Sequence, residues 1–132
     1  MDRDPIDPPP HPRQDALADE AESRKACESL AALSTQNFRV EKSEWVAASR
    51  VPAGPGGATM EVPSHCLFRV VIEPRSSGIE DMSYGTGIEL RLPLAWNGRL
   101  LFQGGGGLDG MLTPAFGSVS GFPSALTRGF AV

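Results

Sequence analysis

The sequence predicts an α/β chain in which one N-terminal helix is followed by mainly antiparallel strands. Helix-forming residues occupy positions 14–33, and three or four strand patterns then follow without a helix between them. The last of these strands, an apolar run, leads into four consecutive glycines. Strands joined by short connections pair antiparallel, because a parallel pair needs a long crossover. The 132 residues are enough for one small domain.

The N-terminal region divides into a tail and a helix. Residues 1–22 are the predicted disordered, Pro-rich acidic tail, and the predicted fold occupies residues 23–132. Proline fixes φ and donates no backbone hydrogen bond, so the prolines before residue 13 predict an extended segment. Ala, Glu, Leu, Lys and Arg over residues 14–33 favour a helix, which we expect to be firmest over residues 23–33.

One face of this helix is expected to contact the rest of the fold. Cys27, Leu30 and Ala31 recur at positions i, i+3 and i+4, which places them on the same side of a helix. We therefore expect the helix to hold Cys27 against the body of the domain.

Apolar alternation predicts the strands. The first strand runs from Phe38 to Val46, and the second, apolar enough to be mostly buried, from Cys66 to Ile72. Glycine and proline predict a turn at residues 52–57 and a connecting loop at residues 74–87. A half-exposed strand follows, in which apolar and charged residues alternate: Ile88, Glu89, Leu90, Arg91 and Leu92.

The last third of the chain carries the glycine loop. Residues 99–102 are predicted as a strand that runs into the glycines at residues 104–107. Glycine reaches φ > 0 and has no side chain, so such a loop can bring backbone N–H groups against an anion or a developing negative charge. Residues 124–128 predict one or two helical turns with Gly129 as the C-cap, and residues 130–132 begin a further strand.

Composition excludes some classes of partner. The chain is 40% hydrophobic and 21% charged, as in ordinary globular proteins, and its net charge is −4. This charge argues against nucleic acid or an anionic membrane surface as a partner. No apolar stretch reaches the roughly 20 residues of a membrane-spanning helix, and the N-terminus lacks the apolar core of a signal peptide.

Two segments of the last third resemble a known family. Pro93-Leu94-Ala95-Trp96-Asn97-Gly98-Arg99 with its glycine run, and later Arg128-Gly129-Phe130-Ala131-Val132, are similar to the N-terminal part of tannases and feruloyl esterases. These are α/β-hydrolases that cleave esters of aromatic acids, and the family includes mono(2-hydroxyethyl) terephthalate hydrolases. The resemblance covers most of the chain, from about Cys27 onward. It implies the N-terminal part of an α/β-hydrolase fold, truncated before the catalytic half.

The resemblance implies a role for the glycine loop in ester hydrolysis. In α/β-hydrolases a glycine-rich loop after an early strand commonly supplies one oxyanion-hole N–H. Matching the motif assigns this donor to the backbone N–H of Gly106, with Gly105 and Gly107 as its neighbours. The other interpretation is a tight loop whose glycines only permit close packing. We expect Trp96 to pack beneath the loop and Asp109 to bond the loop amides.

The nucleophile is not expected in this chain. Residues 117–121 begin and end with glycine, but Val119 stands where the elbow motif needs serine, and Ser118 and Ser120 lack a preceding apolar strand. In the family the serine, acid and histidine of the triad all lie later. We therefore expect the chain alone to be inactive, with a small aromatic ester as the substrate of the full-length protein. No cofactor is expected in this segment; in the family a calcium site can lie in a lid inserted later.

The cysteines and His65 each allow two interpretations. Cys27 and Cys66 read on their own as free buried thiols or as a disulfide. The resemblance favours the disulfide, and also a secreted or periplasmic protein, although no signal peptide is found. His65 beside Cys66 could suggest a metal pair. Adjacent residues do not easily face one metal and two more ligands are missing, so a structural histidine is the preferred interpretation.

Two other functions fit the glycine loop less well. Residues 105–110 match the Gly-x-Gly-x-x-Gly pattern of a nucleotide-binding module. That fold needs a helix that begins inside the motif and an acidic residue about 20 positions later, and Pro114 and Gly117 disfavour the helix. A non-catalytic β-rich binding module is favoured only if the chain is complete and folds alone.

Overall fold

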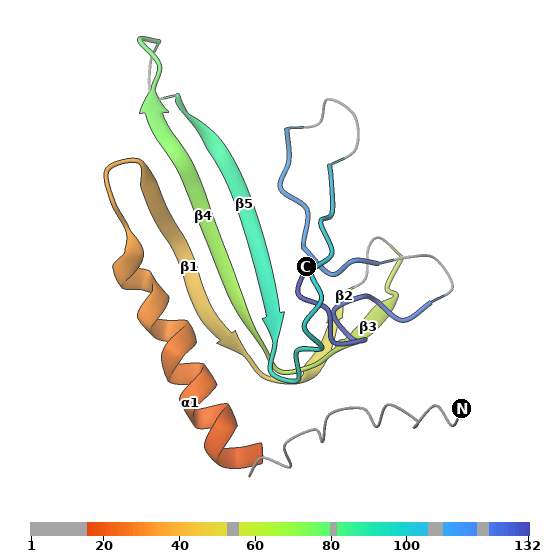
Figure 1. Cartoon of the computed structure of the whole chain (residues 1–132). Helices are drawn as coiled ribbons and strands as arrows, with labels where there is room; N and C mark the ends of the chain where they lie inside the picture. The colour runs from red at the N-terminus through yellow and green to blue at the C-terminus, as the bar shows by residue number, and fades with distance from the viewer. Residues whose placement is uncertain (1–15, 53–55, 80–81, 106–109, 119–121) are drawn as a thin grey trace, which may run out of the picture.

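The computed structural model describes residues 16–52, 56–79, 82–105, 110–118 and 122–132, with side chains from residue 19 onward. Helix α1 (Ala16–Ser29) continues into a short 3₁₀ helix, η1 (Leu30–Leu33), and is followed by strands (Figure 1). The strands are β1 (Phe38–Val46), β2 (Ser49–Pro52), β3 (Thr59–Val62), β4 (His65–Ser76) and β5 (Ser83–Pro93). One helix and mostly antiparallel strands fit part of an α/β-type domain, as predicted.

The helix begins earlier than its predicted firm part. Residues 16–22, which we assigned to a disordered tail, are helical, whereas residues 1–15 lie outside the described residues. Asp19 in the first turn complements the positive end of the helix dipole. Trp45 Nε1 on β1 also donates to Glu20 Oε1 at 3.4 Å. The local charge and the one tertiary contact stabilise turns that composition alone left uncertain.

The buried face of the helix is narrower than predicted. Cys27 is buried, but Leu30 is only partly buried and Ala31 is exposed. The reason is the change to a 3₁₀ helix after Ser29, because its period of 3.0 residues rotates the following side chains off the 3.6-residue stripe.

The central sheet has the order β1-β4-β5, and both pairs are antiparallel. The predicted loop at residues 74–87 is wrong at both ends, since β4 continues to Ser76 and β5 begins at Ser83. Pairing with a neighbouring strand overrides the weak strand propensity of Ser and Gly here. Gly85 also permits a close approach, because a Cβ at this position would collide with Val71 Cγ1.

A second, two-stranded sheet was not predicted. Strands β2 and β3 pair antiparallel, from Ser49 opposite Val62 to Pro52 opposite Thr59. They flank the predicted turn at residues 52–57, of which residues 53–55 lie outside the described part. Both strands are only four residues long, too short for alternation to distinguish them from a loop.

The main apolar core lies between this hairpin and the end of the chain. Its buried members are Val62, Ala115, Ala125, Leu126 and Val132. Partly buried apolar side chains from both regions pack around them: Val51, Met60, Phe116 and Phe130. The core therefore holds the C-terminal segment against β2 and β3 (Figure 1).

The end of the chain pairs antiparallel with β5 on one side and parallel with the segment at residues 99–102 on the other. Val132 and Arg91 exchange both backbone N–H···O bonds, at 2.8 and 3.0 Å, which is the pattern of an antiparallel pair. On its other side the same segment makes a parallel bridge between Ala131 and Leu100. The predicted strands at residues 99–102 and 130–132 thus meet, although only as an isolated bridge.

The turn before this bridge ends as predicted. Residues 125–129 form turns, not a regular helix, and Gly129 has φ +89°. The N–H of Gly129 donates to Leu126 O, and that of Phe130 to Ala125 O, both at 3.0 Å. These two bonds and the left-handed glycine match the Schellman cap.

In the part of the chain that is described, no helix is long and apolar enough to cross a membrane.

Candidate active-site loop and the residues that hold it

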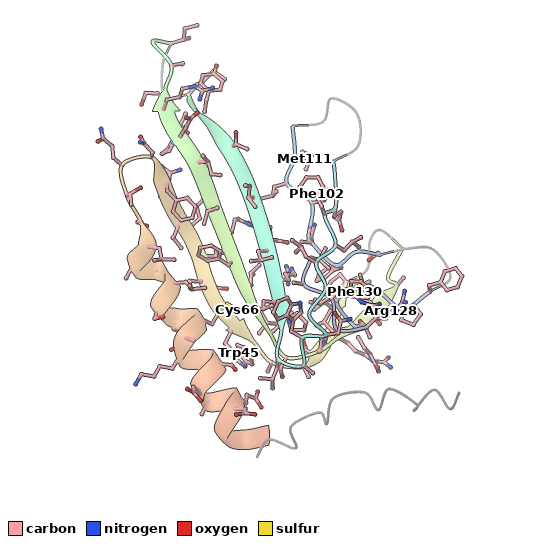
Figure 2. The ribbon with its side chains drawn as sticks, in the orientation of Figure 1. Trp45, Cys66, Phe102, Met111, Arg128 and Phe130 are labelled. Carbon is pink, nitrogen blue, oxygen red and sulfur yellow. A yellow bond between two sulfur atoms is a disulfide. The ribbon has the colours of Figure 1, made fainter. Side chains whose placement is uncertain are left out.

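The glycine loop follows the parallel bridge between Leu100 and Ala131. Leu101 N donates to Ala131 O at 2.8 Å, and the chain continues through Phe102, which is 90% exposed, to the exposed Gly104 and Gly105. Figure 2 shows Phe102 and Met111 on the two arms of this loop. The predicted donor residue Gly106, its neighbour Gly107, and Asp109 lie outside the described residues, so their roles stay predictions.

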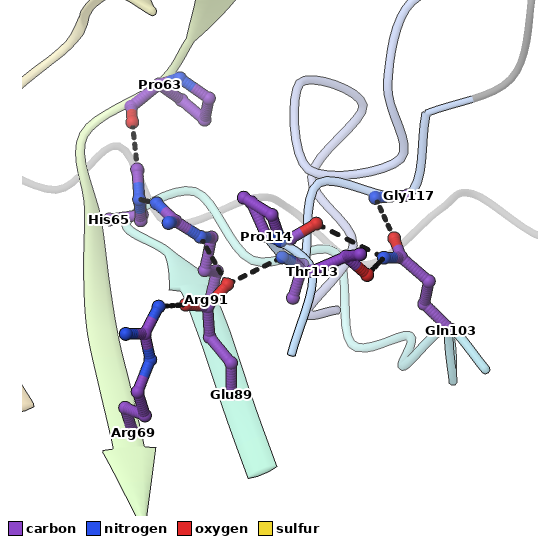
Figure 3. Close-up of polar contacts among 10 residues, drawn as sticks. Pro63, His65, Arg69, Glu89, Arg91, Gln103, Thr113, Pro114 and Gly117 are labelled. Carbon is purple, nitrogen blue, oxygen red and sulfur yellow. Dashed lines mark hydrogen bonds and ion pairs between the residues drawn. The ribbon is translucent and has the colours of Figure 1, made fainter. Parts of the chain in front are cut away.

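The side chain of Gln103 connects the two arms of the loop (Figure 3). Its Nε2 donates to Thr113 Oγ1 at 3.3 Å and to Pro114 O at 3.1 Å. Its Oε1 accepts the backbone N–H of Gly117 at 2.9 Å. These partners are 10, 11 and 14 positions along the chain. Sequence reasoning missed this residue; the available signal was a glutamine immediately before four glycines.

The returning segment at residues 113–117 is also bonded to the central sheet. The backbone N–H of Ala115 donates to Glu89 Oε2 on β5 at 2.6 Å. Gly117 is buried with φ +65°, and a Cβ there would lie 2.6 Å from the Cβ of Ala125 and 2.9 Å from Leu101 Cδ2. Only glycine therefore lets this segment approach both the core and the strand at residues 99–102.

Glu89 is the centre of a buried charged cluster (Figure 3). Its side chain is 1% exposed, and it accepts from Arg69 Nη2 at 2.5 Å and from Arg91 Nε at 3.2 Å. Arg69 and Glu89 are cross-strand partners in the β4–β5 register. The Arg91 guanidinium also lies 4.4 Å from the ring centre of Phe116. The cluster thus joins β4, β5 and the segment after the glycine loop.

In β5 the charged side chains are buried and the apolar ones are exposed, which is the reverse of what the apolar alternation predicts. Glu89 and Arg91 are each 8% exposed, whereas the apolar Ile88 and Leu92 on the other face are 43% and 40% exposed. A carboxylate can be buried where it is paired and hydrogen-bonded, and the C-terminal segment supplies that cover. The signal in the sequence was Arg69, the one charged residue in the apolar run at residues 66–72.

His65 is a structural residue of the same cluster. It is fully buried, with Nδ1 2.7 Å from Pro63 O and Nε2 2.9 Å from Arg91 Nη1. A carbonyl only accepts and a guanidinium only donates, so Nδ1 carries the proton and Nε2 is the acceptor. Burial, opposed by the Pro63 hydrogen bond and reinforced by the charge of Arg91, lowers the pKa of His65 below its usual value.

The pKa of Glu89 is also lowered. Burial alone would raise it, but the Ala115 N–H, the hydrogen bond from Arg69, and the charge and hydrogen bond of Arg91 together favour the carboxylate. Glu89 is therefore ionised and His65 neutral around pH 7. With two guanidinium groups and one carboxylate, the cluster carries a net charge of +1.

The two segments that carry the family resemblance contact one another. Asn97 N donates to Gly129 O at 2.9 Å, and Asn97 Nδ2 donates to Arg128 O at 3.2 Å. Asn97 Oδ1 also accepts from Arg99 N at 2.9 Å, closing a turn in which Gly98 has φ +83°. These bonds align the strand at residues 99–102 with residues 130–132, so the motif residues outside the glycine run have a structural role.

We predicted that Trp96 packs beneath the glycine loop, but the structure places it beside α1. Its Nε1 donates to Arg99 O at 2.9 Å, and its ring lines an apolar groove of about 380 Å³ beside α1. Other walls of the groove are Leu30, Trp45, Leu92 and the two cysteines. Trp96 therefore lies on the same side of the sheet as α1.

The predicted disulfide is present. Cys27 on α1 and Cys66 on β4 are joined, 39 positions apart, and both are buried. Trp45 lies opposite Cys66 in the β1–β4 register, at the same end of the sheet (Figure 2). With Cys66 in a disulfide, it cannot form a metal pair with His65. Within the described ranges, no group of three or more His, Cys, Asp or Glu residues could hold a metal ion.

The other predicted candidates are placed as follows. Ser118 is exposed and lies in irregular chain, not on a turn between strand and helix, and Ser120 lies outside the described residues. The dinucleotide fingerprint at residues 105–110 would need a helix that begins within it. Residues 110–118 are irregular and bonded to Gln103 and Glu89, so the nucleotide-binding alternative is not favoured.

Comparison with known proteins identifies a relative. No family model matches the chain. The chain is 40% identical over 88 residues to the mono(2-hydroxyethyl) terephthalate hydrolase of Piscinibacter sakaiensis, a match that covers 65% of this chain. The chain spans about 14% of the length of that relative. The match supports a relationship to ester hydrolases.

Proposed function

We propose that this chain is the N-terminal part of a carboxylic ester hydrolase with an α/β-hydrolase fold, of the tannase and feruloyl esterase type. One observation carries the proposal: the parallel contact between Leu100 and Ala131 leads directly into the glycine loop. In open α/β sheets, ligands bind beyond the carboxyl ends of the strands, where the strand order changes. The similarity to an ester hydrolase supports ester cleavage as the chemistry.

In this proposal the loop stabilises charge that develops during acyl transfer. Attack on an ester carbonyl produces a tetrahedral intermediate with a negatively charged oxygen, and the backbone N–H of Gly106 donates to that oxygen. Gly105 and Gly107, having no side chains, leave space for its approach. Donors of this kind lower the barrier because they interact with the transition state more strongly than with the substrate. The nucleophilic serine and its base come from outside these 132 residues.

The proposed substrate is an ester of an aromatic acid. The relative is named for the hydrolysis of a terephthalate monoester, whose acid is aromatic. The chemistry requires no cofactor from this segment, and the net charge of −4 gives no reason to expect nucleic acid or a membrane as a partner.

A chimera tests the proposed function. The 88 aligned residues of this chain replace the matching stretch of the Piscinibacter sakaiensis enzyme, and hydrolysis of mono(2-hydroxyethyl) terephthalate is measured. We expect the chimera to retain turnover and the purified chain alone to show none on a chromogenic ester. A folded but inactive chimera would refute the proposal, and so would turnover by the chain alone that Ser118→Ala or Ser120→Ala abolishes.

The donor itself is tested by deleting one backbone N–H in the chimera. Incorporating glycolic acid at position 106 replaces that N–H with an ester oxygen while keeping the shape of the loop. We expect kcat to fall by about 10²–10³ with little change in KM, as for other oxyanion donors. The same replacement at position 105 is the matched control. An equal loss at both positions, or none at 106, would contradict the assignment.

A further inference from the structure

We infer that Gln103 and Glu89 are positioning residues, which hold the two described arms of the glycine loop, residues 101–105 and 110–117, to each other and to the central sheet. The inference rests on the proposed function and goes beyond it, because neither residue belongs to the glycine motif. It stands on one juxtaposition: the segment at residues 113–117 is bonded on one side to Gln103 and on the other to Glu89 (Figure 3).

The amide of Gln103 suits this role. A glutamine amide has two N–H donors and one acceptor oxygen. Here the nitrogen bonds Thr113 Oγ1 and Pro114 O, and the oxygen bonds the N–H of Gly117. A carboxylate could not donate to the first two partners, and an aliphatic side chain could make none of the three bonds.

Glu89 holds the same segment from the sheet. Its Oε2 accepts the N–H of Ala115, and its carboxylate is itself held by Arg69 and Arg91. Both arginines lie on paired strands of the central sheet, so the acceptor has a fixed position. Hydrogen bonds to a charged acceptor are about twice as strong as neutral ones.

Holding both arms has a consequence for catalysis. A glycine-rich loop has high conformational entropy, and closing its ends removes part of that freedom before the substrate binds. Donors that are already oriented need no reorganisation when the negative charge develops. Loosening either attachment should therefore lower kcat more than it raises KM.

Hydrogen–deuterium exchange on the full 132-residue chain tests the attachment directly. In Gln103→Met, a variant of similar length that loses all three bonds, we expect the amides of residues 115–117 to exchange roughly tenfold faster. In Glu89→Gln, which weakens the whole charged cluster, exchange at Ala115 should rise more than exchange in β4. The amides of β4 serve as the internal reference, and Gln36→Met, at another exposed glutamine, is the matched control. Unchanged exchange at residues 115–117 would overturn the inference.

Kinetics in the chimera test the catalytic consequence. For Gln103→Met we expect kcat to fall roughly tenfold or more with KM within about threefold, and Gln36→Met to leave both unchanged. Gln103→Glu keeps the acceptor for Gly117 but not the two donors. Its kcat should lie between that of Gln103→Met and that of the unsubstituted chimera. Faster exchange with unchanged kcat would refute the positioning role.

The outcomes separate this inference from the proposed function. If the unsubstituted chimera is folded but inactive while the exchange results hold, the proposed function fails and the attachment of the loop stands. If Gln103→Met and Gln103→Glu both lose the far-UV circular dichroism of the native chain, Gln103 belongs to the stability of the fold and the positioning role is overturned.

Discussion

The two faces of the central sheet are held to their covering segments by different means. On one face α1 is attached through the Cys27–Cys66 disulfide, next to an apolar groove. On the other face the segment after the glycine loop is attached through hydrogen bonds to the buried carboxylate of Glu89. A covalent link restricts mainly the unfolded chain, whereas a buried carboxylate acts only when it is ionised and fully bonded. The two faces should therefore respond to different perturbations.

The largest expected effect is the loss of the disulfide. Replacing both cysteines with serine should lower the free energy of unfolding by about 4 kcal/mol, since the closed loop spans 39 positions. Urea unfolding with and without reductant measures this, and Ser29→Ala, an exposed serine on α1, is a control for helix substitution. If the free energy of unfolding did not change on reduction, the helix face would be held by packing alone.

A smaller effect is expected from breaking the charged cluster. Glu89→Gln keeps the size of the side chain but leaves two guanidinium groups without their carboxylate, which should cost about 3 kcal/mol. The control is Glu41→Gln, because its ion pair with Arg39 is exposed and should contribute about 0–1 kcal/mol. Urea midpoints at pH 7 compare the two variants, and equal midpoints would show that the buried cluster contributes no more than a surface pair.

The smallest effect is a pH dependence confined to the charged face. Because the pKa of His65 is lowered on folding, the unfolded chain binds a proton first, and stability is lost as pH falls below about 6.5. The lowered pKa of Glu89 adds a further loss below about 4.5. Each group changes the free energy of unfolding by at most about 1.4 kcal/mol per pH unit.

Thermal unfolding between pH 7.5 and 5 measures the contribution of His65. His65→Gln should remove the slope in this range, while His11→Gln, at the only other histidine, should keep it. The disulfide cysteines do not titrate, so the link between α1 and β4 itself contributes no slope here. A slope that persists in His65→Gln would assign the pH dependence to another part of the molecule.

Local patterns predicted those elements whose causes are close in the sequence. Helix-forming composition located α1 and η1, and alternation located β1, the first part of β4 and the last part of β5. The left-handed glycine at 129 and the Schellman cap also follow from local chemistry. The Cys27–Cys66 pairing needed the family resemblance as well, because two cysteines alone fit either free thiols or a bridge.

The candidate site could be predicted only in part. The glycine run located the loop, but not Gln103, whose partners are 10 to 14 positions away. Alternation in β5 showed that its two faces differ, but not that Glu89 and Arg91 would be on the covered one. Which face is buried depends on where the segments at residues 113–118 and 122–132 pack against the sheet.

By itself, then, the sequence determined which stretches can be helix, strand or tight turn, because propensity and periodicity act within a few residues. The tertiary structure decided that charged side chains would fill the interior of one sheet face and that Trp96 would point toward α1. The physical reason is that a buried charge is tolerated only where partners from other strands and from a distant segment complete its hydrogen bonds, and those partners meet only when the chain has folded.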